Sequence, residues 1–193
     1  LATVESPFKP DGGLSVLDGN LGRGVIKTSA LRNPHCTLKA PAVVFEDQFE
    51  LDDAFKSGKL DKDCIVVVRF QGPSAIGMPE LHRLTPPLGV LQDRGFKVAL
   101  VTDGRMSGAS GKVPAAIHVT PEAYKGGLLA KVHDGDLIEL NTVTGELTLH
   151  VDDATLAARE AQPANLAKHH VGMGREMFAG MRAMLTGAEE GAC

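Results

Sequence analysis

The segment that most constrains the fold is residues 64–70, Cys-Ile-Val-Val-Val-Arg-Phe, which is almost continuously β-branched or apolar. An unbroken apolar run of this kind is typical of a strand that is buried on both faces of a sheet. The run at residues 97–101, Lys-Val-Ala-Leu-Val, indicates a second buried strand. Two such strands with helical segments between them predict an α/β domain.

The remaining patterns extend this prediction over the whole chain. Turn signals and alternation predict further strands at residues 14–17, 24–27, 42–45 and 115–119, and a hairpin of 136–140 with 146–151. Helical patterns occupy residues 48–56, 80–93, 154–160 and 174–185, and the second of these is interrupted or kinked by Pro86 and Pro87. We therefore expect one domain over residues 1–193, with a partly closed, mixed sheet and peripheral helices.

Composition excludes several classes of function. Aromatic residues make up only 4% of the 193 residues and the net charge is −4, which argues against a nucleic-acid partner. Cys36, Cys64 and Cys193 have neither disulfide nor zinc-site spacing, so a reducing cytoplasm is the expected compartment. Cys64 is expected to be a small buried apolar residue. We see no membrane span or signal peptide, and the first residue, Leu1, suggests a fragment or processed product.

A small, polar loop follows the second buried strand, at residues 102–112. It combines glycines, hydroxyls and cations: Gly104, Gly108 and Gly111; Ser107 and Ser110; Arg105 and Lys112. Glycines allow a ligand to approach the backbone closely, and α/β proteins bind ligands at the carboxyl ends of strands. The loop therefore suits an anionic, oxygen-rich ligand. An ordinary flexible turn is the alternative, because the loop lacks the Gly-Lys-Ser/Thr ending of a P-loop.

Glu80 lies in a second glycine-rich loop, which follows the first buried strand. If the two strands are neighbours, both loops leave one edge of the sheet, and Glu80 and Ser107 share a pocket. A carboxylate beside a serine suggests a hard cation with an alcohol nearby. Glu80 is equally suited to complement the dipole of the helix it precedes. The chain shows no Ser-His-Asp arrangement, no nucleophile elbow and no histidine spacing typical of a metal site.

Five motifs in this sequence resemble the carboxy-terminal domain of the dihydroxy-acid and phosphogluconate dehydratases. They are Gly-Asn-Leu-Gly at 19–22, Val-Phe-Glu-Asp-Gln at 44–48, Val-Arg-Phe-Gln-Gly-Pro at 68–73, Gly-Met-Pro-Glu at 77–80 and Thr-Asp-Gly-Arg-Met-Ser-Gly at 102–108. The resemblance runs over nearly the whole chain, and residues 78–85 and 104–116 are most similar to the members that act on 6-phosphogluconate. It implies the swivelling β/β/α domain, a barrel-like mixed sheet with helices around it.

The resemblance also implies a reaction and roles for individual residues. The reaction is loss of water from 6-phospho-D-gluconate to give 2-dehydro-3-deoxy-6-phospho-D-gluconate, a step of the Entner–Doudoroff pathway. Ser107 matches the serine whose alkoxide is the base, and Glu80 matches a carboxylate that helps to hold a divalent cation such as Mg²⁺. From charge and position, Arg105, Ser110 and Lys112 are candidates for binding the substrate.

Relatives in this family are much longer than this chain. Their iron–sulfur cluster, a 4Fe–4S type, takes its ligands from an amino-terminal domain that is absent here, and Cys36, Cys64 and Cys193 do not match those ligands. We therefore expect an isolated carboxy-terminal portion that is inactive alone, and a homodimer when full length. Two alternatives stay open: a dehydratase of the same family acting on an unphosphorylated dihydroxy or sugar acid, and a non-catalytic anion-binding or assembly module.

Overall fold

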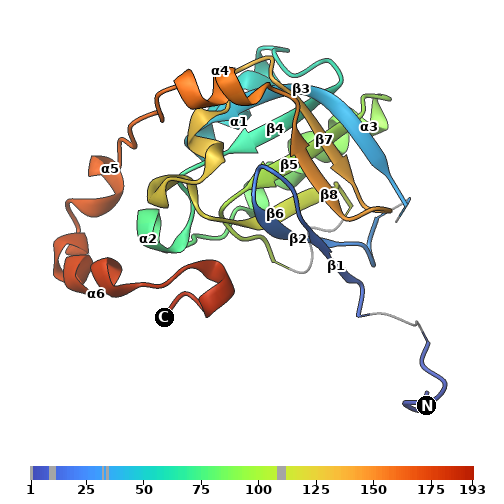
Figure 1. Ribbon diagram of the computed structural model, residues 1–193, viewed down its shortest axis with the longest axis horizontal. Coiled ribbons are helices and arrows are strands. Elements are labelled where there is room, and N and C mark those ends of the chain that lie inside the picture. Colours follow the sequence, from blue (N-terminus) through green and yellow to red (C-terminus); the bar gives the residue numbers. More distant parts are fainter. Residues whose placement is uncertain (1, 9–11, 32, 34, 108–111) are drawn as a thin grey trace.

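The computed structural model describes residues 2–8, 12–31, 33, 35–107 and 112–193. Its strands are β1 (Leu14–Leu17), β2 (Arg23–Lys27), β3 (Thr37–Phe45), β4 (Cys64–Val68), β5 (Val98–Thr102), β6 (Ala115–Thr120), β7 (Leu137–Asn141) and β8 (Glu146–Leu149). They form an eight-stranded sheet in the order β1-β2-β6-β5-β4-β3-β7-β8, which curls around a central core (Figure 1).

The centre of the sheet is parallel and its flanks are antiparallel. Strands β3, β4, β5 and β6 pair in parallel, whereas β1 with β2 and β7 with β8 form antiparallel hairpins on either side. The two flanks approach each other at Asp18, whose N–H donates to Gly145 O at 2.8 Å and whose carbonyl accepts from Leu147 N at 3.1 Å. The sheet is therefore a nearly closed barrel, which confirms the predicted fold class.

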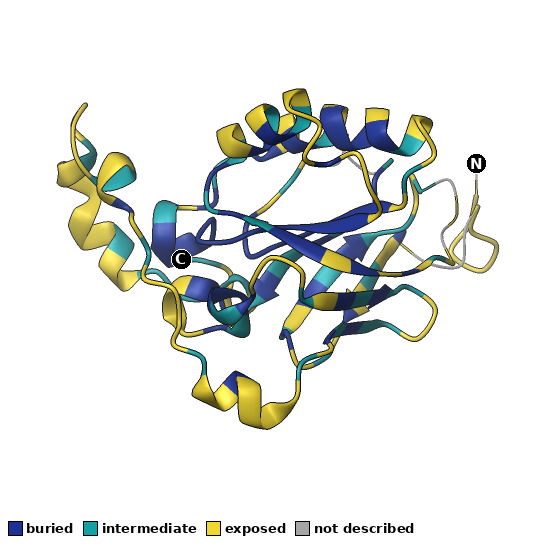
Figure 2. Ribbon diagram, turned by 90° about the horizontal axis from the view of Figure 1, so that it is seen from above, coloured by how far each residue is buried: buried dark blue, intermediate teal, exposed yellow. Residues whose placement is uncertain are grey.

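Six α-helices are described, and they differ greatly in how far they are buried. They are α1 (Gln48–Lys56), α2 (Pro73–Ile76), α3 (Thr85–Asp93), α4 (Asp153–Ala158), α5 (Ala167–His170) and α6 (Ala179–Met184). Helices α1 and α3 pack on the parallel part of the sheet, while the segment from α4 to α6 runs along the outside of the domain (Figures 1 and 2). In the described ranges, no helix is long and apolar enough to cross a bilayer.

The two faces of the parallel strands belong to two separate apolar clusters. On β4, Ile65 and Val67 point into the barrel, whereas Val66 and Val68 face α1 and α3. Because β4 is buried on both faces, it carries the unbroken apolar run that predicted it. Cys64 begins this strand with no exposed surface, and burial raises the pKa of its thiol to about 11, so the predicted small apolar role is confirmed.

Several elements differ from the sequence-based prediction. Strand β3 begins at Thr37 rather than at residue 42, because its first half pairs with the neighbouring strand β7. Helix α3 begins at Thr85, where Pro86 and Pro87 occupy its first turn; they start the helix rather than interrupt it, since first-turn N–H groups need no partner within the helix. The four-residue helices α2 and α5 were not predicted.

Candidate active site

The loops that follow β4 and β5 meet at one edge of the sheet. Val68 and Thr102, the last residues of the two strands, are partners in a parallel pair, so the chain leaves both strands in the same direction. The two loops then form a short parallel bridge between Glu80 and Arg105. The predicted adjacency of the two strands is therefore confirmed, and the two glycine-rich loops lie side by side.

Glu80 and Ser107 are brought together by a direct hydrogen bond. The backbone N–H of Ser107 donates to Glu80 Oε1 at 2.8 Å. The other carboxylate oxygen, Oε2, accepts from Nη1 of Arg105 at 3.0 Å. The Glu80 side chain is 34% exposed and that of Arg105 is 48% exposed, so the pair is open to a ligand.

Arg105 joins the two loops from both its side chain and its backbone. Its Nε donates to Met78 O at 2.7 Å, and its carbonyl accepts from Leu81 N at 3.3 Å. With the Glu80 ion pair, these contacts fix the Gly-Met-Pro-Glu segment against the loop after β5. Arg105 was predicted to bind substrate; the structure places it beside Glu80, where the guanidinium also positions the carboxylate.

A buried carboxylate, that of Asp103, lies directly behind this pair. It accepts hydrogen bonds from the backbone N–H groups of Phe70 (3.2 Å), Gln71 (2.9 Å) and Ala123 (2.9 Å). Burial raises its pKa to about 6 despite these three donors, and the nearby negative charge of Glu122 acts in the same direction. Asp103 thus ties together the segments that follow β4, β5 and β6.

Gly104 allows the two loops to approach closely. A Cβ at this position would lie 2.7 Å from both Gln71 Cβ and Leu81 Cδ1, which is closer than real Cβ contacts. Gly104 O also accepts from the N–H of His118, a half-buried histidine with φ of 56°. Burial, together with the charge of Arg105, lowers the pKa of His118. Sequence spacing gave no reason to connect His118 with this site.

Of the other two predicted substrate-binding residues, the structure describes only one. Ser110 lies outside the described residues. Lys112 Nζ is 3.0 Å from Asp93 Oδ2, at the last residue of α3. A role for Lys112 in substrate binding stays a prediction.

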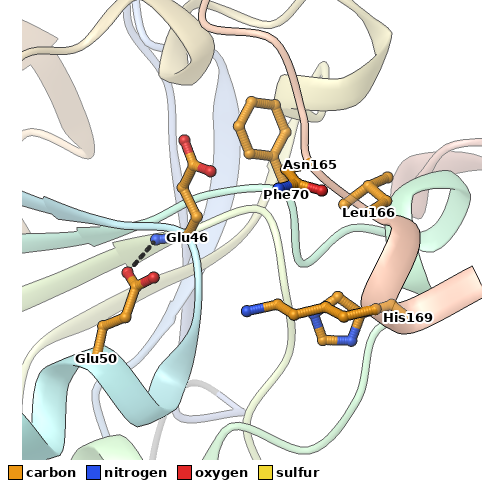
Figure 3. Close-up of a pocket in the computed structure, with 7 residues that line it drawn as sticks. Glu46, Glu50, Phe70, Asn165, Leu166 and His169 are labelled. Atoms are coloured by element: carbon orange, nitrogen blue, oxygen red, sulfur yellow. Dashed lines mark hydrogen bonds between the residues drawn. The ribbon is translucent and has the colours of Figure 1, made fainter.

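A hollow opens at the same edge of the sheet, beyond the ends of β3 and β4. Its volume is about 130 Å³, and Glu46, Phe70 and His169 lie around it (Figure 3). Lys168, which also lines the hollow, donates from Nζ to Asp47 Oδ2 at 2.5 Å. Burial favours a raised pKa for Asp47, but hydrogen bonds from Lys168 and from the N–H of Phe49 bring it below its usual value. The sequence analysis did not find this cluster, because 121 residues separate Lys168 from Asp47.

The described residues offer few ligands for a metal or cluster. Among them, no group of three or more His, Cys, Asp or Glu side chains could hold a metal ion. Cys36 and Cys64 lie at the starts of different strands, Cys193 is exposed, and all three are free thiols. The cysteines of this chain therefore do not fit an iron–sulfur cluster, whereas Glu80 has the oxygen chemistry of a single ligand to a hard cation.

Comparison with known proteins decides the family. The family described as dihydroxy-acid/6-phosphogluconate dehydratase C-terminal matches residues 1–192. This chain belongs to that family. The predicted resemblance is thus confirmed, and Ser107 and Glu80 lie in two of the five motifs on which it was based.

Curated relatives of this dehydratase family are similar over the whole chain. A phosphogluconate dehydratase of Escherichia coli (strain K12) is 64% identical over 192 residues, which cover 100% of this chain and 32% of the relative. Relatives of the same name from Pseudomonas aeruginosa and Zymomonas mobilis are 59% and 53% identical, over 100% of this chain and 32% and 31% of their own lengths. The chain therefore spans about a third of the curated relatives it matches.

Proposed function

We propose that this chain is the carboxy-terminal part of a hydro-lyase that converts 6-phospho-D-gluconate into 2-dehydro-3-deoxy-6-phospho-D-gluconate. The observation that carries the proposal is the 2.8 Å contact between Ser107 and Glu80, on two loops that belong to the family's motifs. The relatives named phosphogluconate dehydratase, 64% and 59% identical, support the choice of a phosphorylated sugar acid as substrate.

The reaction needs a base that acts at C2 of the substrate and an acid that acts at the neighbouring C3. A base removes the weakly acidic proton from C2 while the hydroxyl leaves C3, and the resulting enol tautomerises to the ketone. We assign the base to the Ser107 hydroxyl. A serine acts as a base only when its alkoxide is stabilised, by a metal or by positive local potential. Arg105 supplies positive charge two residues away in the same loop.

Glu80 has the chemistry to hold a divalent cation such as Mg²⁺. Each of its oxygens accepts one hydrogen bond and so keeps a lone pair for a further partner. Mg²⁺ is commonly held by one or two protein carboxylates together with water and substrate oxygens. When bound, the cation would polarise the substrate oxygens. Arg105 and the N–H of Ser107 orient the Glu80 carboxylate for this role.

The iron–sulfur cluster of the proposed enzyme belongs to the part of the polypeptide outside this chain. We propose a 4Fe–4S cluster there, because Cys36, Cys64 and Cys193 do not fit one here. Residues 1–193 then form one domain that supplies Ser107 and Glu80 but lacks turnover alone. A cytoplasmic homodimer stays our expectation for the full-length enzyme; the three free thiols support the reducing compartment.

The test is a pair of carboxylate variants in the full-length enzyme, prepared without oxygen. Glu80→Gln removes the charge that would hold the cation, and we expect turnover of 6-phosphogluconate to fall by about 100-fold or more. Asp61→Asn is the matched control, since Asp61 also pairs with an arginine, Arg94, at 3.1 Å but on the exposed surface. Near-normal turnover by Glu80→Gln would overturn the assignment.

A second substrate in the same assay separates the proposed enzyme from its family alternative. The expected result is turnover of 6-phosphogluconate well above that of an unphosphorylated dihydroxy acid. The opposite preference would favour a dihydroxy-acid or sugar-acid dehydratase. If neither substrate turns over in an enzyme with an intact cluster, the non-catalytic alternative replaces both.

A further inference from the structure

Large apolar side chains are exposed along the last helical segment of the chain. Met177 is 79% exposed, Met181 is 61% exposed and Met184 is 75% exposed. Phe178, beside them, is 49% exposed. We call these four residues the methionine stripe. Val171 and Met173, just before it, are 60% and 94% exposed and extend the apolar surface.

The methionine stripe has helical spacing and contributes no buried residue to the core of the described chain. A 3₁₀ turn (Arg175–Phe178) leads directly into α6, and residues 177, 181 and 184 follow each other at intervals of four and three, so they share one side. Neither element contains a buried residue (Figure 2). Helices this short are not stable alone in water and normally owe their stability to the packing of an apolar side.

An exposed, contiguous group of this kind marks a protein interface. Single exposed apolar residues are ordinary on protein surfaces, but clustered ones indicate a covered surface in the working protein. Methionine suits such a surface, because its flexible thioether side chain adapts to the shape of a partner. The opposite side of the segment is polar and carries Arg175 and Arg182, whose contacts lie within the segment itself.

The stripe lies close to the edge of the sheet that carries the candidate active site. Helix α6 runs beside α2 (Figure 1), and Ser74 Oγ donates to Leu185 O, one residue after α6, at 3.4 Å. Helix α2 begins one residue after Gly72, in the same loop that leads to Glu80. A partner that covers the stripe therefore also lies near α2 and the loop that leads to Glu80.

We propose that the methionine stripe is the surface on which the preceding part of the longer polypeptide docks. This docking proposal takes one point from the proposed function, namely that the chain is the carboxy-terminal part of the enzyme. Relatives are about three times as long as this chain, so a large folded portion must contact it somewhere. The stripe is exposed and apolar, and it lies near the site that this portion has to complete. A contact between two copies of residues 1–193 would not complete that site.

Site-specific cross-linking in the full-length enzyme tests which surface covers the stripe. A photo-reactive p-benzoylphenylalanine replaces Met181 in one preparation and Ala179 in the other. Ala179 is exposed and begins α6 on the side away from the stripe, so it is the matched control. After irradiation, mass spectrometry identifies the peptides joined to each position.

The expected result is strong cross-linking from position 181, to peptides of the first two-thirds of the polypeptide, at several times the yield from position 179. Cross-links confined to the region of residues 1–193, in either copy, would overturn the proposal. Equal yields from the two positions would overturn it as well.

A pair of charge variants gives an independent readout. Met177→Glu together with Met181→Glu places two negative charges on the methionine stripe, which is not part of the core. In the full-length enzyme the same change should lower the melting temperature by several degrees and turnover by at least about tenfold, whereas Ala179→Glu should alter neither. An unchanged full-length enzyme would contradict the proposed docking. Because Ser107 and Glu80 are untouched, this failure would leave their assigned roles standing.

Discussion

Ser107 contacts Glu80 through its backbone, with 2.8 Å between the Ser107 nitrogen and Glu80 Oε1, across 27 residues of sequence. The contact uses the main-chain N–H, so the Ser107 side chain can be changed without removing it. The same carboxylate is held from its other oxygen by Arg105. The position of Glu80 and the hydroxyl chemistry of Ser107 are therefore separable by mutation.

Arg105→Lys tests whether the guanidinium positions Glu80. A lysine ammonium cannot reproduce the planar fork that reaches Met78 O and Glu80 Oε2 together. We expect kcat/KM for 6-phosphogluconate to fall about 10- to 100-fold, as is typical when a partner of a metal ligand is lost. Arg94→Lys, at the exposed ion pair with Asp61, should leave kcat/KM within twofold. Equal effects of the two changes would contradict a positioning role for Arg105.

Asp103→Asn tests the buried carboxylate behind the site. Asparagine has one acceptor oxygen in place of two and brings an NH₂ group toward backbone donors, so the free energy of unfolding should fall by about 1–3 kcal/mol. Chemical denaturation of residues 1–193 measures this difference. An unchanged free energy of unfolding would show that the three N–H groups find other partners.

The same variant predicts a dependence on pH. Burial raises the pKa of Asp103 to about 6 in the folded state, above its ordinary value of 3.8. Between these pH values the folded state binds a proton that the unfolded state has released, so the contribution of Asp103 to stability falls as pH rises through 6. The difference in unfolding free energy between wild type and Asp103→Asn should therefore be larger at pH 4.5 than at pH 7. A difference in unfolding free energy that grows as the pH rises would contradict this prediction.

Two glycine substitutions should have opposite effects on stability. Gly104→Ala places a Cβ 2.7 Å from Gln71 Cβ and Leu81 Cδ1, and forcing these groups apart should cost about 1–3 kcal/mol. Gly89→Ala lies inside α3 with no atom within 4 Å of the added Cβ, and should stabilise the chain by about 0.5–1 kcal/mol. Melting temperatures of the two variants, measured together, check both signs; a neutral Gly104→Ala would show that the loops can move apart.

Local signals in the sequence were enough to predict the elements that depend on near neighbours. Helix α1 has its predicted bounds, residues 48–56, because Asp47 caps it from the adjacent position at 2.9 Å. Strands β4 and β5 were predictable because burial on both faces leaves an unbroken apolar run. Their parallel pairing then placed Ser107 and Glu80 together, as the sequence analysis expected.

Elements that depend on distant partners could not be predicted in the same way. The first N–H groups of α2, those of Ser74 and Ala75, are bound by Glu122, which is more than 45 residues away in the sequence. The pairing of Lys168 with Asp47 spans 121 residues. Lys112 was predicted to contact substrate from its charge and position in the loop, and nothing in its surroundings along the chain indicates the ion pair with Asp93.

Turnover of 6-phosphogluconate by the full-length Ser107→Ala enzyme, prepared without oxygen and checked for cluster content, tests the central claim most directly. Alanine keeps the backbone N–H that binds Glu80, and Ser57→Ala, whose hydroxyl bonds Ala54 O at the end of α1, is the control. We expect at least a 100-fold loss of turnover, with a wild-type cluster content and a normal control. Near-normal turnover by Ser107→Ala would show that the base lies elsewhere and would contradict the assignment.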